Sequence, residues 1–198
     1  NALVWGTVPA SNGESGPTVA LVAHLDTSPE APGDHVKPQV IRSYAGGDIQ
    51  LPSGNVIDVA SCPALESMIG MTLVTTDGST LLGGDDKAGV AIIMELVATL
   101  VENPHLVHGP VKVLFTCDEE IGRGTDKIDL QKLDATVAYT LDGGGAAIID
   151  EETFSADAAT VRFEGHNIHP SIAKDRMVNA VRAAADFVAR LPSDTCSP

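Results

Sequence analysis

The chain has 198 residues, of which 43% are hydrophobic, so it is long enough to bury the core of at least one domain. Its 27 acidic and 12 basic residues give a formal net charge of −15 at pH 7. This charge excludes nucleic acid and anionic membrane surfaces as expected partners, because both require a cationic protein face.

Three widely spaced cysteines, Cys62, Cys117 and Cys196, predict neither a disulfide framework nor a cysteine-based metal site. The longest apolar run, residues 88–101, contains Glu95 and is too short to span a bilayer. We therefore expect a cytoplasmic protein with no membrane partner. Because the chain starts with Asn and nothing in it resembles a signal peptide, we expect a fragment of a longer protein.

The first half of the chain predicts strands separated by long connections. Residues 2–10 and 18–26 are rich in Val and Leu and predict two strands around a polar turn. The Pro- and Gly-rich stretch from 28 to 63 predicts an elaborate loop with only short strands. Residues 72–84 predict a hairpin that turns at Asp77-Gly78.

The next part alternates between helix and strand. Residues 88–102 are apolar nearly all round and predict a buried helix, which Asn103-Pro104 ends. Residues 111–116 and 136–141 predict continuous apolar strands, with a short surface helix between them in residues 124–135. This alternation predicts an α/β fold, a mostly parallel sheet flanked by helices.

The pattern changes after Asp150. Residues 159–165 alternate between apolar and polar and predict a half-exposed strand. An amphipathic helix is predicted from Met177 to Leu191. We expect a first domain over residues 1–152 and the beginning of a second, α+β domain over residues 153–198.

Charged side chains gather where the predicted strands end and where the apolar helix begins. In open α/β sheets, ligands bind at the carboxyl edge of the strands. Carboxylates crowded there would repel one another, so divalent metal ions, with one bridging carboxylate, are the simplest compensation. Imidazole and carboxylate ligands suit Zn²⁺, Mn²⁺ or Co²⁺. The residues are His24, Asp26, Asp85, Asp86, Asp118, Glu119, Glu120 and Asp142.

Each of these motifs also has a structural interpretation. A lone His often supports a strand end, DEE is often a solvated corner, and GGDD is an ordinary helix cap. Their joint placement at one edge favours a functional site. Residues 24 and 26 share one side of a strand, so one can bind metal while the other orients it. Glu119 and Glu120 point in opposite directions, so one can bind metal while the other acts as a general base.

The motifs, taken together, resemble one enzyme family. The stretches VALVAHLDTSPEAPG, LLGGDDKAGVA, FTCDEEIGRG, AYTLDGGG and GHNIHPSIAKDRMVNA resemble the peptidase T branch of the co-catalytic zinc peptidases, which are tripeptide aminopeptidases. The wider family includes aminoacylases and acetylornithine deacetylase. The resemblance covers essentially this whole chain but about half of a family member. It implies a zinc-exopeptidase-like catalytic domain over residues 1–152, followed by the start of a lid domain.

The resemblance also implies a site for two Zn²⁺ ions. His24 and Asp142 would bind the first zinc, Asp85 would bridge both, and Glu120 would bind the second. In the family, a histidine from the far C-terminal part completes the second site. The chain ends before any such residue, so we expect these 198 residues alone to bind the second zinc weakly and to be poorly active.

The remaining roles follow from the same resemblance. Glu119 would be the general base, and Asp26 would hold the His24 ring. The peptide between Asp85 and Asp86 would be cis. Independently of the resemblance, the position of Asp86 before the helix predicts that it is a cap or a support for its neighbour. His169 would approach the substrate carbonyl from the lid. Asn179 would lie near the small peptide substrate.

Three alternatives remain open. The protein could be a deacylase or carboxypeptidase of the same family, because the metal-binding residues are shared. It could be a metal-binding module without catalysis, although Glu119 has no purpose in such a site. A nucleotide-binding domain is disfavoured, because GGDDKAG lacks the Walker spacing and its aspartates would repel phosphates.

Overall fold

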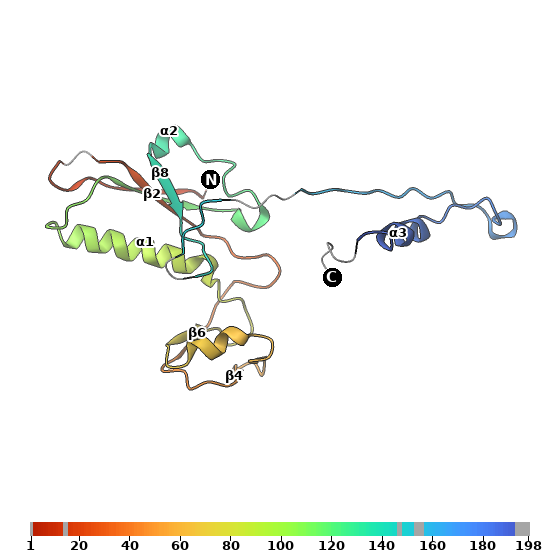
Figure 1. The fold of residues 1–198 in the computed structure, drawn as a ribbon, viewed down its shortest axis with the longest axis horizontal. Coiled ribbons are helices and arrows are strands. Elements are labelled where there is room, and N and C mark those ends of the chain that lie inside the picture. The colour runs from red at the N-terminus through yellow and green to blue at the C-terminus, as the bar shows by residue number, and fades with distance from the viewer. Residues whose placement is uncertain (1, 14–15, 146–147, 153–156, 193–198) are drawn as a thin grey trace. The chain divides into compact units, whose positions relative to one another are not determined.

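The structure is a computed structural model that describes residues 2–13, 16–145, 148–152 and 157–192 (Figure 1). The chain divides into two units, Asn1–Ile149 and Asp150–Pro198. Among the described residues, no helix is both long and apolar enough to cross a membrane. Cys196 and residue 153, the predicted start of the second domain, lie outside the described residues.

A four-stranded sheet with the order β1-β7-β2-β8 organises the first unit. β7 (Val111–Thr116) and β8 (Val137–Thr140) run parallel to β2 (Val19–His24), and β1 (Val4–Val8) runs antiparallel to β7. The inner strands β2 and β7 are the continuous apolar runs of the sequence, which is typical of parallel strands covered on both faces. The prediction of a mostly parallel sheet is confirmed.

Helix α1 (Gly84–Glu102) covers one face of this sheet. Its Ile93 is fully buried with Ala23, Val113 and Phe115 of the two inner strands. The neighbouring Ile92, however, is 58% exposed. The prediction that α1 is buried all round is wrong, because a helix lying on a sheet buries one face, and its flanks stay exposed in the part of the chain that the structure describes.

The short helix α2 (Leu130–Leu133) packs on a second core cluster of the same sheet. Its Leu133 is buried with Ala20 of β2 and Leu114 of β7. The Asp129 side chain caps the helix by accepting hydrogen bonds from the backbone N–H groups of Gln131 and Lys132. The short helix expected between the two apolar strands is confirmed.

The segment between β2 and α1 has a small core of its own. Tyr44, Ile49 and Leu65 are buried together there. The segment is therefore more than the elaborate loop that its Pro and Gly content predicts. Its elements are β3 (Gln39–Ile41), β4 (Ile49–Gln50), β5 (Val56–Ile57), the 3₁₀ helix η2 (Pro63–Met68) and β6 (Leu73–Thr75).

The predicted hairpin at Asp77-Gly78 is wrong. β6 pairs with the distant β3 in antiparallel register, with Val74 opposite Val40, rather than with the residues that follow Asp77. The Asp77 carboxylate accepts hydrogen bonds from the backbone and side chain of Ser79 and from Lys37. These bonds stabilise an open bend in place of a two-residue hairpin turn.

The second unit contains the 3₁₀ helix η4 (Pro170–Ile172) and helix α3 (Ala180–Val188). The predicted amphipathic helix is confirmed, although it starts later than the pattern indicates. The prediction of a strand over residues 159–165 is wrong. These residues are all described by the structure, and they form no strand. Among the residues that the structure describes, none pairs with residues 159–165 as a strand, and an isolated bridge nearby joins His166 to Val178.

Candidate metal centre

The carboxyl ends of the parallel strands meet at one edge of the sheet. His24, the last residue of β2, lies opposite Thr116, the last residue of β7. Beyond the end of β8, the backbone N–H of Leu141 donates to the carbonyl of Val22. Chain segments that follow the three strands therefore emerge together.

Three potential metal ligands meet at this edge. One ligand atom each from His24, Asp85 and Asp142 lies within 4.8 Å of the other two. His24 Nε2 is 2.7 Å from Asp85 Oδ1 and 3.8 Å from Asp142 Oδ2. The imidazole is buried, whereas the Asp85 side chain is 69% exposed. The group is thus anchored in the protein and open to solvent on its carboxylate side.

The other ring nitrogen of His24 is held by the residue two positions later. Nδ1 lies 2.9 Å from the backbone carbonyl oxygen of Asp26 and 3.4 Å from its carboxylate. A carbonyl oxygen only accepts, so the Nδ1 proton points to it and Nε2 faces the carboxylates. The backbone carbonyl of Asp26 thus makes the closer contact with the ring, and its carboxylate lies farther away.

The titration of the group reflects a shortage of positive charge. Burial raises the pKa of Asp142 to about 6, and the charges of Asp85 and Asp86 contribute further. Burial lowers the pKa of His24, but the hydrogen bond to Asp85 and the charges of Asp142 and Asp26 outweigh it, so the net shift is upward. A divalent cation would relieve this crowding, so the donor set fits a metal ion.

The two glutamates after β7 lie differently with respect to this group. Asp118 adopts a left-handed conformation with φ of 66°, and the 3₁₀ helix η3 (Glu119–Ile121) follows. Glu119 Oε2 is 3.8 Å from His24 Nε2, and its side chain is 49% exposed. The backbone N–H of Glu120 donates to Asp26 Oδ2. The structure thus brings Glu119 to the cluster, and Glu120 is not one of its three members.

The beginning of α1 supplies two aspartates with different surroundings. Gly83 precedes the helix with φ of 71°, a conformation that glycine adopts without strain. The peptide between Asp85 and Asp86 is cis, as the family resemblance implies. Asp85 faces His24, whereas Asp86 is only 2% exposed. The sequence identifies Asp86 as a cap but gives no sign of this burial.

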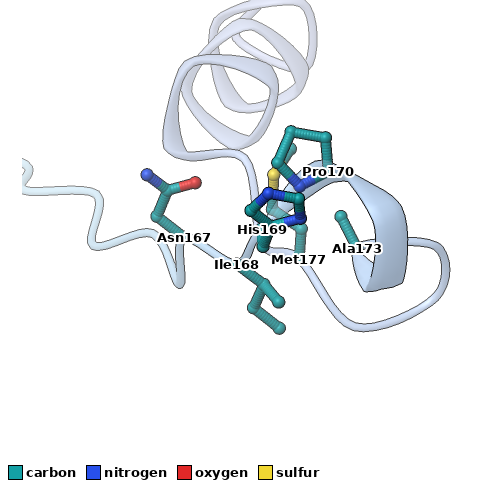
Figure 2. A pocket seen from close by; sticks show the side chains of 6 residues that line it. All are labelled: Asn167, Ile168, His169, Pro170, Ala173 and Met177. Carbon is teal, nitrogen blue, oxygen red and sulfur yellow. The ribbon is translucent and has the colours of Figure 1, made fainter.

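His169 and Asn179 lie in the second unit. His169 lines a hollow of about 540 Å³ together with Asn167, Pro170 and Met177 (Figure 2). Its Nδ1 accepts a hydrogen bond from the backbone N–H of Ser171. Asn179 caps α3 by accepting from the N–H of Arg182, and it lines an adjoining hollow.

The chain is similar to known proteins over nearly its whole length. It is 44% identical over 196 residues to Peptidase T of Geobacillus sp. (strain WCH70), covering 98% of this chain and 48% of that protein. It is 46% identical over 191 residues to Peptidase T of Desulfitobacterium hafniense, covering 96% of this chain and 47% of that protein. The chain therefore spans about half the length of the curated relatives it matches.

Two solved structures share the fold. An aminopeptidase PepT from Bacillus cereus matches with a TM-score of 0.59 and 23% identity, over 96% of this chain and 43% of that one. A tripeptidase from Staphylococcus aureus matches with a TM-score of 0.61 and 22% identity, over 95% and 42%. The model of peptidase family M20/M25/M40 matches residues 75–198. The chain belongs to peptidase family M20/M25/M40.

Proposed function

We propose that the full-length protein is a zinc-dependent aminopeptidase that removes the N-terminal residue from tripeptides in the cytoplasm. The observation that carries this proposal is the cluster of His24, Asp85 and Asp142 in a chain 44% to 46% identical to proteins called Peptidase T. The formal net charge of −15 disfavours a polyanionic substrate.

The metal ligands are proposed as follows. His24 and Asp142 would hold one Zn²⁺, and Glu120 would hold a second. Asp85 would bind both ions. Imidazole nitrogen and carboxylate oxygen are common ligands of Zn²⁺. When bound, the two ions would polarise the scissile carbonyl group and lower the pKa of water toward neutrality. The Asp85 side chain is 69% exposed, so its carboxylate group is accessible to an ion from solvent.

Glu119 is the proposed general base. Its carboxylate lies beside the cluster and half in solvent, so a water molecule and a peptide can both approach it. Glu119 would take a proton from the attacking water and deliver it to the amine that leaves when the peptide bond breaks. Asp26 positions His24 and, through the N–H of Glu120, the turn that carries Glu119.

The second unit is proposed as the beginning of a lid, with residues 1–152 as the catalytic domain. His169 Nδ1 lies 2.8 Å from the Ser171 hydroxyl oxygen and accepts the Ser171 backbone N–H at 3.3 Å. The hydroxyl can also donate, so both contacts are satisfied when the neutral ring carries its proton as an Nε2–H group. That N–H can donate to a substrate carbonyl oxygen. The side-chain nitrogen of Asn179 is a second donor beside the hollow, because its oxygen is used by the helix cap.

A deacylase or carboxypeptidase is the second candidate, because its metal ligands would be the same. The test compares a tripeptide with a free amino terminus and the same tripeptide acetylated, using the full-length protein loaded with Zn²⁺. We expect release of the first residue from the free peptide only. Cleavage that requires the acetyl group, or release of the C-terminal residue, would contradict the proposal.

A further inference from the structure

The carboxylate of Asp86 connects two segments that lie far apart in the sequence. Its Oδ2 accepts a hydrogen bond of 3.0 Å from the backbone N–H of His24, at the end of β2. Its Oδ1 accepts one of 3.1 Å from the backbone N–H of Gly89, in the first turn of α1. Both bonds are buried, and Asp86 is 2% exposed. The end of the strand and the start of the helix are therefore tied to one side chain.

This arrangement differs from an ordinary helix cap. Asp129, which caps α2, is exposed and accepts only from Gln131 and Lys132 of its own helix. Asp86 uses one oxygen for its helix and the other for the sheet. Burying a carboxylate costs free energy unless its hydrogen bonds are made, and here one bond comes from the helix and the other from the strand.

Gly89 brings the helix close to a third segment. A Cβ atom at position 89 would overlap the carbonyl oxygen of Leu141 and the Oδ1 atom of Asp86. Only glycine allows α1 to approach the chain this closely where it leaves β8, one residue before Asp142. The first turn of α1 thus contacts both Asp86 and the segment that carries Asp142.

We propose that Asp86 and Gly89 form a brace that sets the relative positions of His24, Asp85 and Asp142. The brace deepens the proposed function and rests on its metal site. Asp86 is a positioning residue: it holds the backbone of His24, and it follows Asp85 directly in the chain. Metal ligands need positions accurate to about 0.5 Å, which such supporting hydrogen bonds provide.

The first test is Asp86→Asn in the full-length protein. The amide keeps one acceptor oxygen and turns an NH₂ group toward the other backbone N–H, so one of the two bonds is lost. We expect the affinity for Zn²⁺, measured by competition with a chromophoric chelator, to fall about 10- to 100-fold. The visible absorption of bound Co²⁺ should also change in position or intensity. Asp129→Asn is the matched control, and it should change neither measurement.

A second variant, Gly89→Ala, tests the brace without altering a charge. We expect the same loss of Zn²⁺ affinity and the same change in the Co²⁺ spectrum. Gly84→Ala is its control in the same segment, because the nearest atom to an added Cβ there is 3.8 Å away, on Leu82.

The outcomes separate the brace from the site. If both variants are folded and bind Zn²⁺ as tightly as the unaltered protein, the brace is overturned and the metal site stands. If Asp86→Asn does not fold, the result for Gly89→Ala decides. If the unaltered protein binds no Zn²⁺, the proposed metal site is wrong and the brace falls with it.

Discussion

The Nε2 atom of His24 lies 2.7 Å from Oδ1 of Asp85, although 61 positions separate the two residues along the chain. One ends a strand and the other begins a helix on the same sheet. Between them lies the segment with the small core of Tyr44, Ile49 and Leu65. The contact therefore depends on how α1 packs against the sheet.

Replacing His24 should weaken metal binding at the first of the two proposed sites. Zn²⁺ at 100 times its dissociation constant should raise the free energy of unfolding of the unaltered full-length protein by about 2.7 kcal/mol. In His24→Ala the same Zn²⁺ concentration should give a smaller increase, because the first site has lost its buried nitrogen ligand. Urea unfolding with and without Zn²⁺ measures the difference.

The control for this experiment is His35→Ala. His35 is 92% exposed and contacts only Asp34 among the ion pairs that the described residues form. This variant should keep the full Zn²⁺-dependent increase. An equal loss in both variants would show that Zn²⁺ binds histidines nonspecifically.

Glu119→Gln should separate metal binding from catalysis. The amide is nearly the same size but cannot accept a proton from water, so turnover of a tripeptide should fall about 10²- to 10⁴-fold. The Zn²⁺ content, measured by elemental analysis, should not change. Glu102→Gln at the exposed end of α1 is the control and should be fully active. A Glu119→Gln enzyme with normal turnover would show that another group is the base.

The metal-free protein should lose stability as pH rises from about 4 to about 6. The pKa of Asp142 is raised from 3.8 to about 6, so in this range the folded protein binds a proton that the unfolded chain has released. Stability then decreases with pH, by at most about 3 kcal/mol at 1.36 kcal/mol per unit. The upward pKa shift of His24 also makes the folded protein less stable as pH rises above 6.5.

Urea unfolding in a chelator at several pH values measures this slope. Asp142→Asn should reduce it between pH 4 and 6. Asp77→Asn should leave the slope between pH 4 and 6 unchanged, because hydrogen bonds from Ser79 lower the pKa of Asp77 to about 2. The stability that Asp77 contributes is lost only as pH falls from 3.8 toward 2. A slope between pH 4 and 6 that survives Asp142→Asn would contradict the assignment.

The proximity of His24 and Asp142 was predictable from the sequence, because each stands at the carboxyl end of a continuous apolar strand. Such strands are parallel and share a carboxyl edge, so His24 and Asp142 were expected to meet. The pairing of β3 with β6 was not predictable, because no local signal links Val40 to Val74. The burial of Asp86 was also not predictable, since an aspartate at the start of a helix usually caps the helix and stays exposed to solvent.

The core of the first unit makes a prediction with an internal control. Ile93 is fully buried against the sheet, whereas the adjacent Ile92 is 58% exposed. Ile93→Ala should lower the free energy of unfolding of the 198-residue chain by about 2–5 kcal/mol. Ile92→Ala should change it by no more than about 0.5 kcal/mol. Equal losses in urea unfolding would show that the exposed flank of α1 is covered by another surface.

His169→Ala should lower kcat without changing the Zn²⁺ content. The hydroxyl and backbone N–H of Ser171 both contact Nδ1, which favours the tautomer with its proton on Nε2. In the proposed mechanism this Nε2–H donates to the substrate carbonyl oxygen as negative charge develops on it. Loss of one such donor typically costs about 10²- to 10³-fold in kcat. His166→Ala is the control, because His166 pairs with Val178 through its backbone, which the substitution keeps. If the two variants are equally active, the donor lies elsewhere. If both lose Zn²⁺, the second unit contributes to the metal site rather than to the carbonyl.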